Sequence, residues 1–232
     1  MPTQSSMNLA EPLVMIVDAD IRFRSALQEL LAKSSMCTAA FGSAAEYLAY
    51  PKPAAPTCLI LDVDLPDANG LDLQQQMKHE YHPPIIFVTA HGDIASSVRA
   101  IRGGAFDFLT KPFCEQQFIQ LVRSALTQDG ERRSKKAERD LLQQRYDSLT
   151  SRECQVLPLV VSGLLNKQAA RHLGISEVTL QIHRGNIMRK MAADSFPDLV
   201  RMALYLKIPV EFSRHAQGRD RVTPIPWPRR SR

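Results

Sequence analysis

The chain has 232 residues, of which 44% are apolar, so it is long enough for one large or two ordinary globular domains and is not a mainly disordered protein. Its longest early apolar run, residues 13–17, is too short for a signal peptide or a membrane span, and its four cysteines form no CxxC pair, so we expect a soluble, cytoplasmic protein with reduced thiols, no zinc site and no membrane partner. Charge is uneven, with 9 basic and 13 acidic residues before position 129 but 20 and 11 from there on, so the two halves are expected to have different partners.

Strand-like and helical patterns alternate over the first half of the chain. Apolar runs predict strands at residues 14–17, 36–41, 58–61, 85–89 and 106–109. Helical spacing predicts helices at residues 21–33, 71–80, 94–102 and 115–126, and a capping box of Ser43 and Glu46 predicts a short helix after the second strand. Five such units predict a doubly wound α/β fold, in which a five-stranded parallel sheet carries helices on both faces.

Polar side chains follow four of the predicted strands. Asp18 and Asp20 come after the first strand, Asp62 after the third, Thr89 ends the fourth, and Lys111 follows the fifth. Each of them alone is explained as a turn or cap residue, but ligands of parallel sheets bind beyond the carboxyl ends of the strands, where these groups would meet. Carboxylates suit Mg²⁺, and a hydroxyl and an ammonium suit phosphoryl oxygens. Asp62 is the natural acceptor carboxylate because it directly follows the apolar run CLIL.

The second half is predicted to be helical. Residues 129–148 are charged and poor in glycine and proline, which favours a helical linker over a coiled coil. A capping box of Thr150 and Glu153 opens a helix that stops at Gly163, and further helices are expected at residues 166–173, at 177–191 and after Pro197. Two short helices joined by a tight glycine turn predict a helix-turn-helix unit within residues 149–208. Residues 1–11 are expected to be a flexible N-terminus and residues 209–232 a basic disordered tail.

The third helix of this unit has the side chains of a DNA-reading helix. Amide, guanidinium and ammonium groups together can contact both bases and phosphates in the major groove, and the lack of acids after Glu177 weakens the alternative of an ordinary amphipathic helix. Gln181 and Arg184 are expected to face the bases, with Arg189 and Lys190 on phosphates. The candidate DNA-binding residues are Lys167, Thr179, Gln181, His183, Arg184, Arg189 and Lys190.

The motifs over residues 12–208 resemble a two-component response regulator of the NarL/FixJ type, closest to the FixJ/StyR branch. The resemblance is carried by LILDVDLPDANGLDL, FVTAHGD, FDFLTKPF and LTSRECQVLPLVVSGLLNKQAARHLGISEVTLQIHRGNIMRKM, which stand in the family's order. It implies a receiver domain over residues 12–128 and a LuxR-type helix-turn-helix domain over residues 149–208.

The resemblance also implies a mechanism and partners. A sensor histidine kinase would phosphorylate Asp62, Thr89 and Lys111 would bind the phosphoryl group, and Phe108 would be the switch aromatic. The carbonyl of Asp64 would join the carboxylates of Asp62 and Asp18 as magnesium ligands. The face of the fourth helix and fifth strand would form a homodimer on activation, and the partners would be promoter DNA, with RNA polymerase as a further candidate.

The chain departs from the family pattern at two places. Ala19 stands where the family usually has the main metal-binding carboxylate, so the Mg²⁺ site is expected to be weakened, and Asp20 would point away if the strand continued. In the third helix, Gln181 stands where a lysine is common, and Gly185 costs about 1 kcal/mol of helix stability.

Two alternative functions stay open. Ala19 leaves room for a transcription factor whose receiver works without phosphorylation. The run LILDVDL also resembles the DxD motif of haloacid-dehalogenase-type phosphotransferases, although here it follows the third strand and not the first, and the helix-turn-helix would then be left without a role. A protein that is not an enzyme is therefore the expectation.

Overall fold

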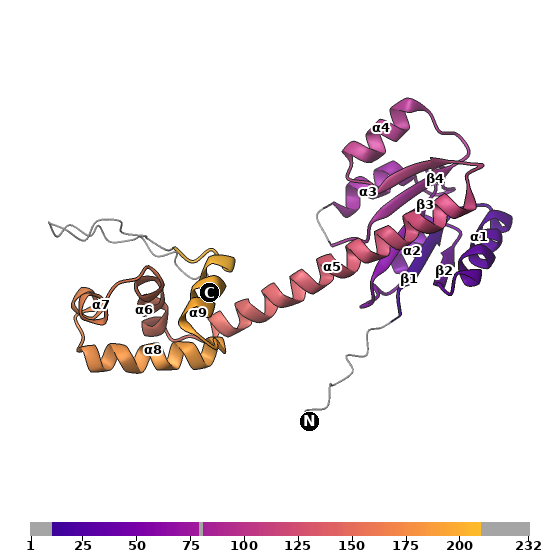
Figure 1. Cartoon of the computed structure of the whole chain (residues 1–232). Coiled ribbons are helices and arrows are strands. Elements are labelled where there is room, and N and C mark those ends of the chain that lie inside the picture. The colour runs from indigo at the N-terminus through magenta and orange to yellow at the C-terminus, as the bar shows by residue number, and fades with distance from the viewer. Residues whose placement is uncertain (1–10, 79–80, 210–232) are drawn as a thin grey trace, which may run out of the picture. The chain divides into compact units, whose positions relative to one another are not determined.

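The structure is a computed structural model that describes residues 11–78 and 81–209 (Figure 1). Contacts within the chain divide it into two compact units, residues 1–136 and 137–232, which are described separately. The expected flexible N-terminus and basic tail lie outside the described residues, apart from Glu11 and Pro209. No helix of the described residues is long and apolar enough to cross a membrane.

The first unit contains a parallel sheet of five strands in the order β2-β1-β3-β4-β5 (Figure 1). This confirms the predicted fold. The strands differ from the sequence expectation by one residue at most at either end. They are β1 Leu13–Val17, β2 Cys37–Phe41, β3 Thr57–Leu61, β4 Ile85–Thr89 and β5 Asp107–Thr110.

Helices cover both faces of this sheet. Their bounds are α1 Ile21–Lys33, α2 Ala44–Ala49, α3 Gly70–Met77, α4 Ile94–Arg102 and α5 Glu115–Asp147. Successive strand residues point to opposite faces, so Val14 and Ile16 pack with α1 and α5, whereas Met15 and Val17 pack with α2 and α3. Burial of these alternating side chains is the main source of stability of the unit.

The strand order places a crevice between β1 and β3. The chain passes from β1 outward to β2 and then returns to β3 on the other side of β1, so the connections leave in opposite directions at this point. A crevice opens at such a reversal beyond the carboxyl ends of the strands. Asp18 and Asp62 directly follow the ends of β1 and β3 and therefore flank it.

Helix α5 is longer than the helix predicted from the sequence at residues 115–126. The expected helix at residues 115–126 and the expected helical linker at 129–148 form one helix that ends at Asp147, and the boundary between the two units falls inside it.

A buried carboxylate fixes the middle of α5 to the first unit. Asp129 is 0% exposed and accepts hydrogen bonds from the Thr57 backbone N–H (2.8 Å), the Tyr81 hydroxyl (2.5 Å) and Arg133 Nε (2.5 Å). Arg133 also donates to the carbonyl of Pro53 at 3.0 Å. A buried charge needs such partners, so this cluster holds the helix against the start of β3.

The second unit is a small helical bundle. Its helices are α6 Ser151–Val161, α7 Asn166–Leu173, α8 Glu177–Met191 and α9 Phe196–Tyr205, which match the predicted positions. The capping box of Thr150 and Glu153 is present at the start of α6. Gly174 has φ +65°, a left-handed conformation that glycine adopts without strain, and it makes the tight turn between α7 and α8.

Candidate functional site

The structure brings the predicted acidic residues and Lys111 together at the crevice. Lys111 Nζ lies 2.5 Å from Asp18 Oδ2 and 3.5 Å from Asp62 Oδ2, so one ammonium bridges two carboxylates. Asp18 is 3% exposed and Asp62 is 9% exposed. The Lys111 ammonium also lies over the ring of Phe23, 3.7 Å from its centroid, which adds a cation–π contact.

Burial disfavours the ionised form of Asp18. Burial raises the pKa of Asp18, and the charge of Asp62 raises it further, while Lys111 and the backbone N–H of Asp20 act in the opposite direction. A raised pKa means that the fold favours the neutral acid, so the ionised form lowers stability above the usual aspartate pKa. Such an arrangement is typical of functional sites and is not needed for packing.

Ala19 brings no carboxylate to the site, and the Asp20 carboxylate is used elsewhere. Strand β1 ends at Val17, and Asp20 is the N-cap of α1, where its side chain accepts from the backbone N–H groups of Arg22 and Phe23. Within residues 11–78 and 81–209, no three His, Cys, Asp or Glu side chains form a group that could hold a metal ion. The sequence expectation that Asp20 turns away therefore agrees with the geometry, although capping and not strand alternation is the cause.

Thr89 and Phe108 lie on the neighbouring strands β4 and β5. Thr89 is 0% exposed, and its hydroxyl accepts the backbone N–H of His91 at 3.3 Å. Phe108 is half-buried against Phe87, with ring centroids 6.1 Å apart. The Asp64 side chain is mostly exposed and lies 3.7 Å from the imidazole of His91, so of its groups only the backbone is a candidate for the site interior.

The exposed face of α8 contains Gln181, as expected from the sequence, but not Arg184. Val178, Gln181, Ile182, Gly185 and Arg189 are exposed and share one face of the helix. The sequence analysis missed Val178 and Ile182, which are 67% and 59% exposed although they are apolar. Exposed apolar residues at this density usually mark a contact surface.

Two predicted DNA-binding residues have partners inside the protein. Arg184 is half-buried, donates to Asn166 Oδ1 and lies over the ring of Phe196. Lys190 Nζ donates to Glu153 Oε2 at 2.7 Å, and Glu153 is only 3% exposed. Their first roles are therefore to hold α8 against α7, α9 and α6.

The remaining predicted residues lie outside this face. Lys167 is exposed on α7, and His183 is half-buried. Thr179 lies near the start of α8, where its hydroxyl is 2.7 Å from that of Ser176.

A receiver-like sheet with an acidic crevice, joined to a helix-turn-helix unit, defines a DNA-binding protein that responds to a signal. Residues 14–123 match the family described as response regulator receiver domain, and residues 147–203 match bacterial regulatory proteins of the luxR family. The chain belongs to the two-component response regulators of the NarL/FixJ type.

Known relatives cover nearly the whole chain. Nodulation protein W of Bradyrhizobium diazoefficiens is 42% identical over 206 residues, which are 88% of this chain and 91% of that protein. The response regulator protein TodT of Pseudomonas putida is 43% identical over 200 residues, covering 86% and 88%. The solved structure of the response regulator StyR is 41% identical with a TM-score of 0.78, covering 84% of this chain and 99% of that one. Full-length FixJ from B. japonicum is 33% identical with a TM-score of 0.51, covering 84% and 97%.

Membership of this family establishes the general function of the chain. The chain is a DNA-binding transcriptional response regulator of a two-component system, in which the receiver implies a sensor kinase as partner. TodT and FixJ are regulators by name, which is consistent with the expectation of a protein that is not an enzyme.

Proposed function

We propose that Asp62 accepts a phosphoryl group from a sensor histidine kinase and that this reaction controls dimerisation and promoter binding. The observation that carries the proposal is the contact of one lysine with two buried carboxylates at the crevice, and Thr89 is buried at the end of the next strand, β4. An oxygen of Asp62 attacks phosphorus, the bond from phosphorus to the kinase histidine breaks, and an acyl phosphate forms. The Lys111 ammonium, which lies near Asp62 already, neutralises the incoming oxygens.

The change in the receiver on phosphorylation begins with a change of hydrogen-bond partner at the Thr89 hydroxyl. Its hydroxyl, which accepts from the His91 backbone N–H, turns to the new phosphoryl oxygens and leaves space beside Phe108. Phe108 is only half-buried, so it can move inward and alter the surface near β5. A local charge change is thereby converted into a different surface.

The residues fit a magnesium ion held by few anionic ligands. Two carboxylates and one ammonium leave a net charge of about −1, and receiver domains typically bind Mg²⁺ for phosphorylation. The carboxylates of Asp18 and Asp62 and the carbonyl of Asp64 would hold it. When bound, the ion supplies positive charge for the incoming phosphoryl group.

Restoring the missing acid is a gain-of-function test of the weakened site. Ala19→Asp is expected to tighten Mg²⁺ binding at least about tenfold, since even outer-shell partners of metal sites have effects of this size, and to speed labelling by acetyl phosphate. Calorimetry and labelling kinetics measure the two effects. Ala32→Asp adds the same charge at the far end of α1 and should change neither. Unchanged Mg²⁺ affinity in Ala19→Asp would mean that the site lacks no ligand.

Dimerisation is assigned to α4 because its outer face is apolar. Ile94, Val98 and Ile101 are 83%, 43% and 50% exposed and lie on one side of the helix. After labelling with acetyl phosphate, sedimentation should show a dimer that binds a selected DNA site more tightly. Val98→Glu should label normally but stay monomeric, whereas Leu48→Glu, at a more exposed apolar position on α2, should dimerise. Normal dimerisation of Val98→Glu would reject this face.

A phosphorylation-independent receiver is the second candidate, and Ala19 is the observation that favours it. In that case the unlabelled protein and the protein labelled with acetyl phosphate would bind DNA equally well. A DxD-type phosphotransferase is a third and weaker candidate, which steady-state phosphate release from small phosphate esters would support.

DNA reading is assigned to the exposed face of α8. Gln181 can pair with adenine, and the neighbouring Val178 and Ile182 can contact thymine methyl groups. Gln181→Ala is expected to cost about 1–3 kcal/mol on the preferred site and to relax base preference there. Arg189→Ala is expected to weaken all sequences alike, with a shallower salt dependence. Binding to a panel of duplexes at several salt concentrations, with half-sites about 10 bp apart, separates the two. Equal, uniform losses in both variants would contradict the division.

The contact of Lys190 with Glu153 is expected to contribute to the stability of the fold, so the stability of a Lys190 variant must be measured before its affinity for DNA. Burial alone would raise the pKa of Glu153, but hydrogen bonds from Lys190 and Thr150 keep that pKa below its usual value. The pair therefore stabilises the fold above the ordinary glutamate pKa and less so as the pH falls below it. Because loss of Lys190 leaves a buried charge without its partner, Lys190 has this structural role in addition to the phosphate contact expected from the sequence.

A further inference from the structure

The Lys111 ammonium has a third partner in the crevice besides the two carboxylates. Its nitrogen lies 3.7 Å from the centroid of the ring of Phe23, the third residue of α1. The carboxylates of Asp18 and Asp62 lie 2.5 Å and 3.5 Å from the same nitrogen. An ammonium has three N–H groups and no acceptor, so two carboxylates and one ring face can take up all of its donors.

The contact between the ring and the ammonium is made in a largely dry place. The Lys111 side chain is 18% exposed, and Phe23 is partly buried and packs against the core of the first unit. The face of an aromatic ring attracts a cation more strongly where both are desolvated. The ring attracts the ammonium without bringing a net charge, so it does not repel an incoming phosphoryl group as a further carboxylate would.

The start of α1 fixes the backbone of Phe23. The Asp20 carboxylate, which caps the helix, accepts the backbone N–H of Phe23 at 3.4 Å. Arg24, the next residue, donates from its guanidinium to the backbone carbonyl of Asp18. These bonds hold the first turn of α1 against the segment that follows β1, so the position of the Phe23 ring over the crevice is set by the fold.

Two further phenylalanines hold the ring itself. Phe113, two residues after Lys111, packs edge-on against Phe23, with centroids 6.2 Å apart and ring planes at 87°. Phe113 in turn packs against Phe118, with centroids 4.9 Å apart, and Phe118 is 0% exposed. Edge-to-face packing is a preferred geometry for aromatic pairs. The Phe23 ring is therefore in place before any phosphoryl donor arrives.

We propose that Phe23 is a positioning residue, which holds the Lys111 ammonium in the crevice and thereby raises the rate at which Asp62 is phosphorylated. The effect on rate rests on the proposed function, whereas the contact between ring and ammonium does not. When an oxygen of Asp62 attacks phosphorus and the bond from phosphorus to the donor breaks, the ammonium turns from a carboxylate oxygen to a phosphoryl oxygen. A ring face requires no fixed donor direction, so the ammonium can turn while Phe23 still holds it.

Fluorination of Phe23 separates the attraction for the cation from packing, because fluorine withdraws electrons from the ring face and leaves the shape of the ring almost unchanged. Full-length proteins with mono-, di- or trifluorophenylalanine at this position are labelled with acetyl phosphate and Mg²⁺. We expect the labelling rate to fall stepwise, by about three- to tenfold in the trifluoro protein, the scale of one desolvated cation–π contact. Phe23→Leu should be slowed as much, and Phe23→Tyr, which keeps an electron-rich ring, should label almost as fast as the wild type.

The same fluorination of Phe118 is the matched control, because this ring packs against Phe113 in the core and should leave the labelling rate unchanged. A labelling rate that is equal across the fluorine series at Phe23 would overturn the proposal. So would a loss in Phe23→Tyr as large as that in Phe23→Leu, since shape and not the ring face would then be responsible.

Urea unfolding measures the contact without phosphorylation. The fluorine signal at position 23 reports on the first unit, and the urea midpoint should fall stepwise with each added fluorine. In Lys111→Met, which removes the charge and keeps a long side chain, the midpoint should not depend on fluorination. Equal dependence in both backgrounds would overturn the proposal. If the unmodified protein is not labelled at all, the proposed function and the rate effect fail together, while the urea series still decides whether Phe23 holds the ammonium.

Discussion

Asp62→Asn is expected to abolish phosphoryl uptake from acetyl phosphate and from any histidine kinase. The amide that replaces the carboxylate is not a nucleophile at neutral pH, so no acyl phosphate can form. The fold should be retained, because the substitution removes one of two carboxylates that share Lys111 and thereby relieves their repulsion. Radioactive labelling and thermal melting measure the two effects, and the melting temperature is expected to stay the same or to rise.

Asp64→Asn is the matched control for this variant. The Asp64 side chain is mostly exposed beside His91, and only its backbone carbonyl has a proposed role, so Asp64→Asn should still be labelled. Stoichiometric labelling of Asp62→Asn, or complete loss of labelling in Asp64→Asn with an intact Asp62, would show that the acceptor has been assigned to the wrong residue.

The sheet and the acidic crevice could be predicted because their signals are local. Each strand is a short apolar run, and residues that directly follow parallel strands meet at one edge of the sheet. Asp18 and Asp62 were found by this rule without any knowledge of contacts. What the rule could not supply is the pairing, namely that Lys111 bridges both carboxylates while Asp20 caps α1.

The position of Arg184 on α8 differs from the sequence expectation for a reason that the sequence itself contains. Gln181 and Arg184 are one turn apart and were expected to share the exposed face. However, the buried residues of α8 are Leu180, Ile187 and Met191. Position 184 is four residues after Leu180 and three before Ile187, so it lies on the same side of the helix as both. Arg184 therefore lies toward the buried side, and its guanidinium is held by Asn166 and Phe196.

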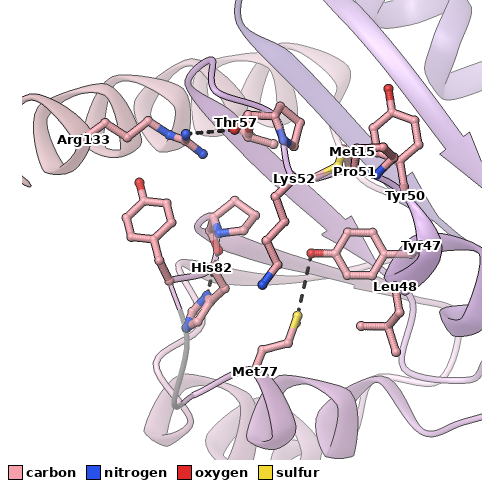
Figure 2. A pocket seen from close by; sticks show the side chains of 13 residues that line it. Met15, Tyr47, Leu48, Tyr50, Pro51, Lys52, Thr57, Met77, His82 and Arg133 are labelled. Carbon is pink, nitrogen blue, oxygen red and sulfur yellow. Dashed lines mark hydrogen bonds between the residues drawn. The ribbon is translucent and has the colours of Figure 1, made fainter. Parts of the chain in front are cut away.

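A cavity and the Asp129 cluster could not be found from the sequence. The cavity of about 290 Å³ in the first unit is lined by residues of α2, α3, α5, β1 and β3 and of loops, which are distant in the chain (Figure 2). Asp129 stands in a run of charged residues, where a solvated side chain is the usual outcome, and its burial depends on Thr57 and Tyr81 being brought to it.

Asp129→Ala is expected to destabilise the first unit by about 3–5 kcal/mol, the usual cost of removing one partner from a buried ion pair. The substitution leaves Arg133 and the Thr57 N–H without their buried acceptor. Urea unfolding of the full chain, followed by far-UV circular dichroism, measures the loss. Tyr81→Phe removes one hydrogen bond of the cluster and should cost about 1–2 kcal/mol.

Glu131→Ala is the matched control for Asp129→Ala, two residues further along α5. Glu131 is exposed and pairs only loosely with Lys135, at 3.8 Å, so its loss should change stability by less than about 1 kcal/mol. If Asp129→Ala were as mild as Glu131→Ala, the carboxylate would not be fixing α5 to the sheet. If it is severe, α5 is attached to the first unit at least as far as residue 133, and only the part of the helix beyond this attachment is left to act as a linker.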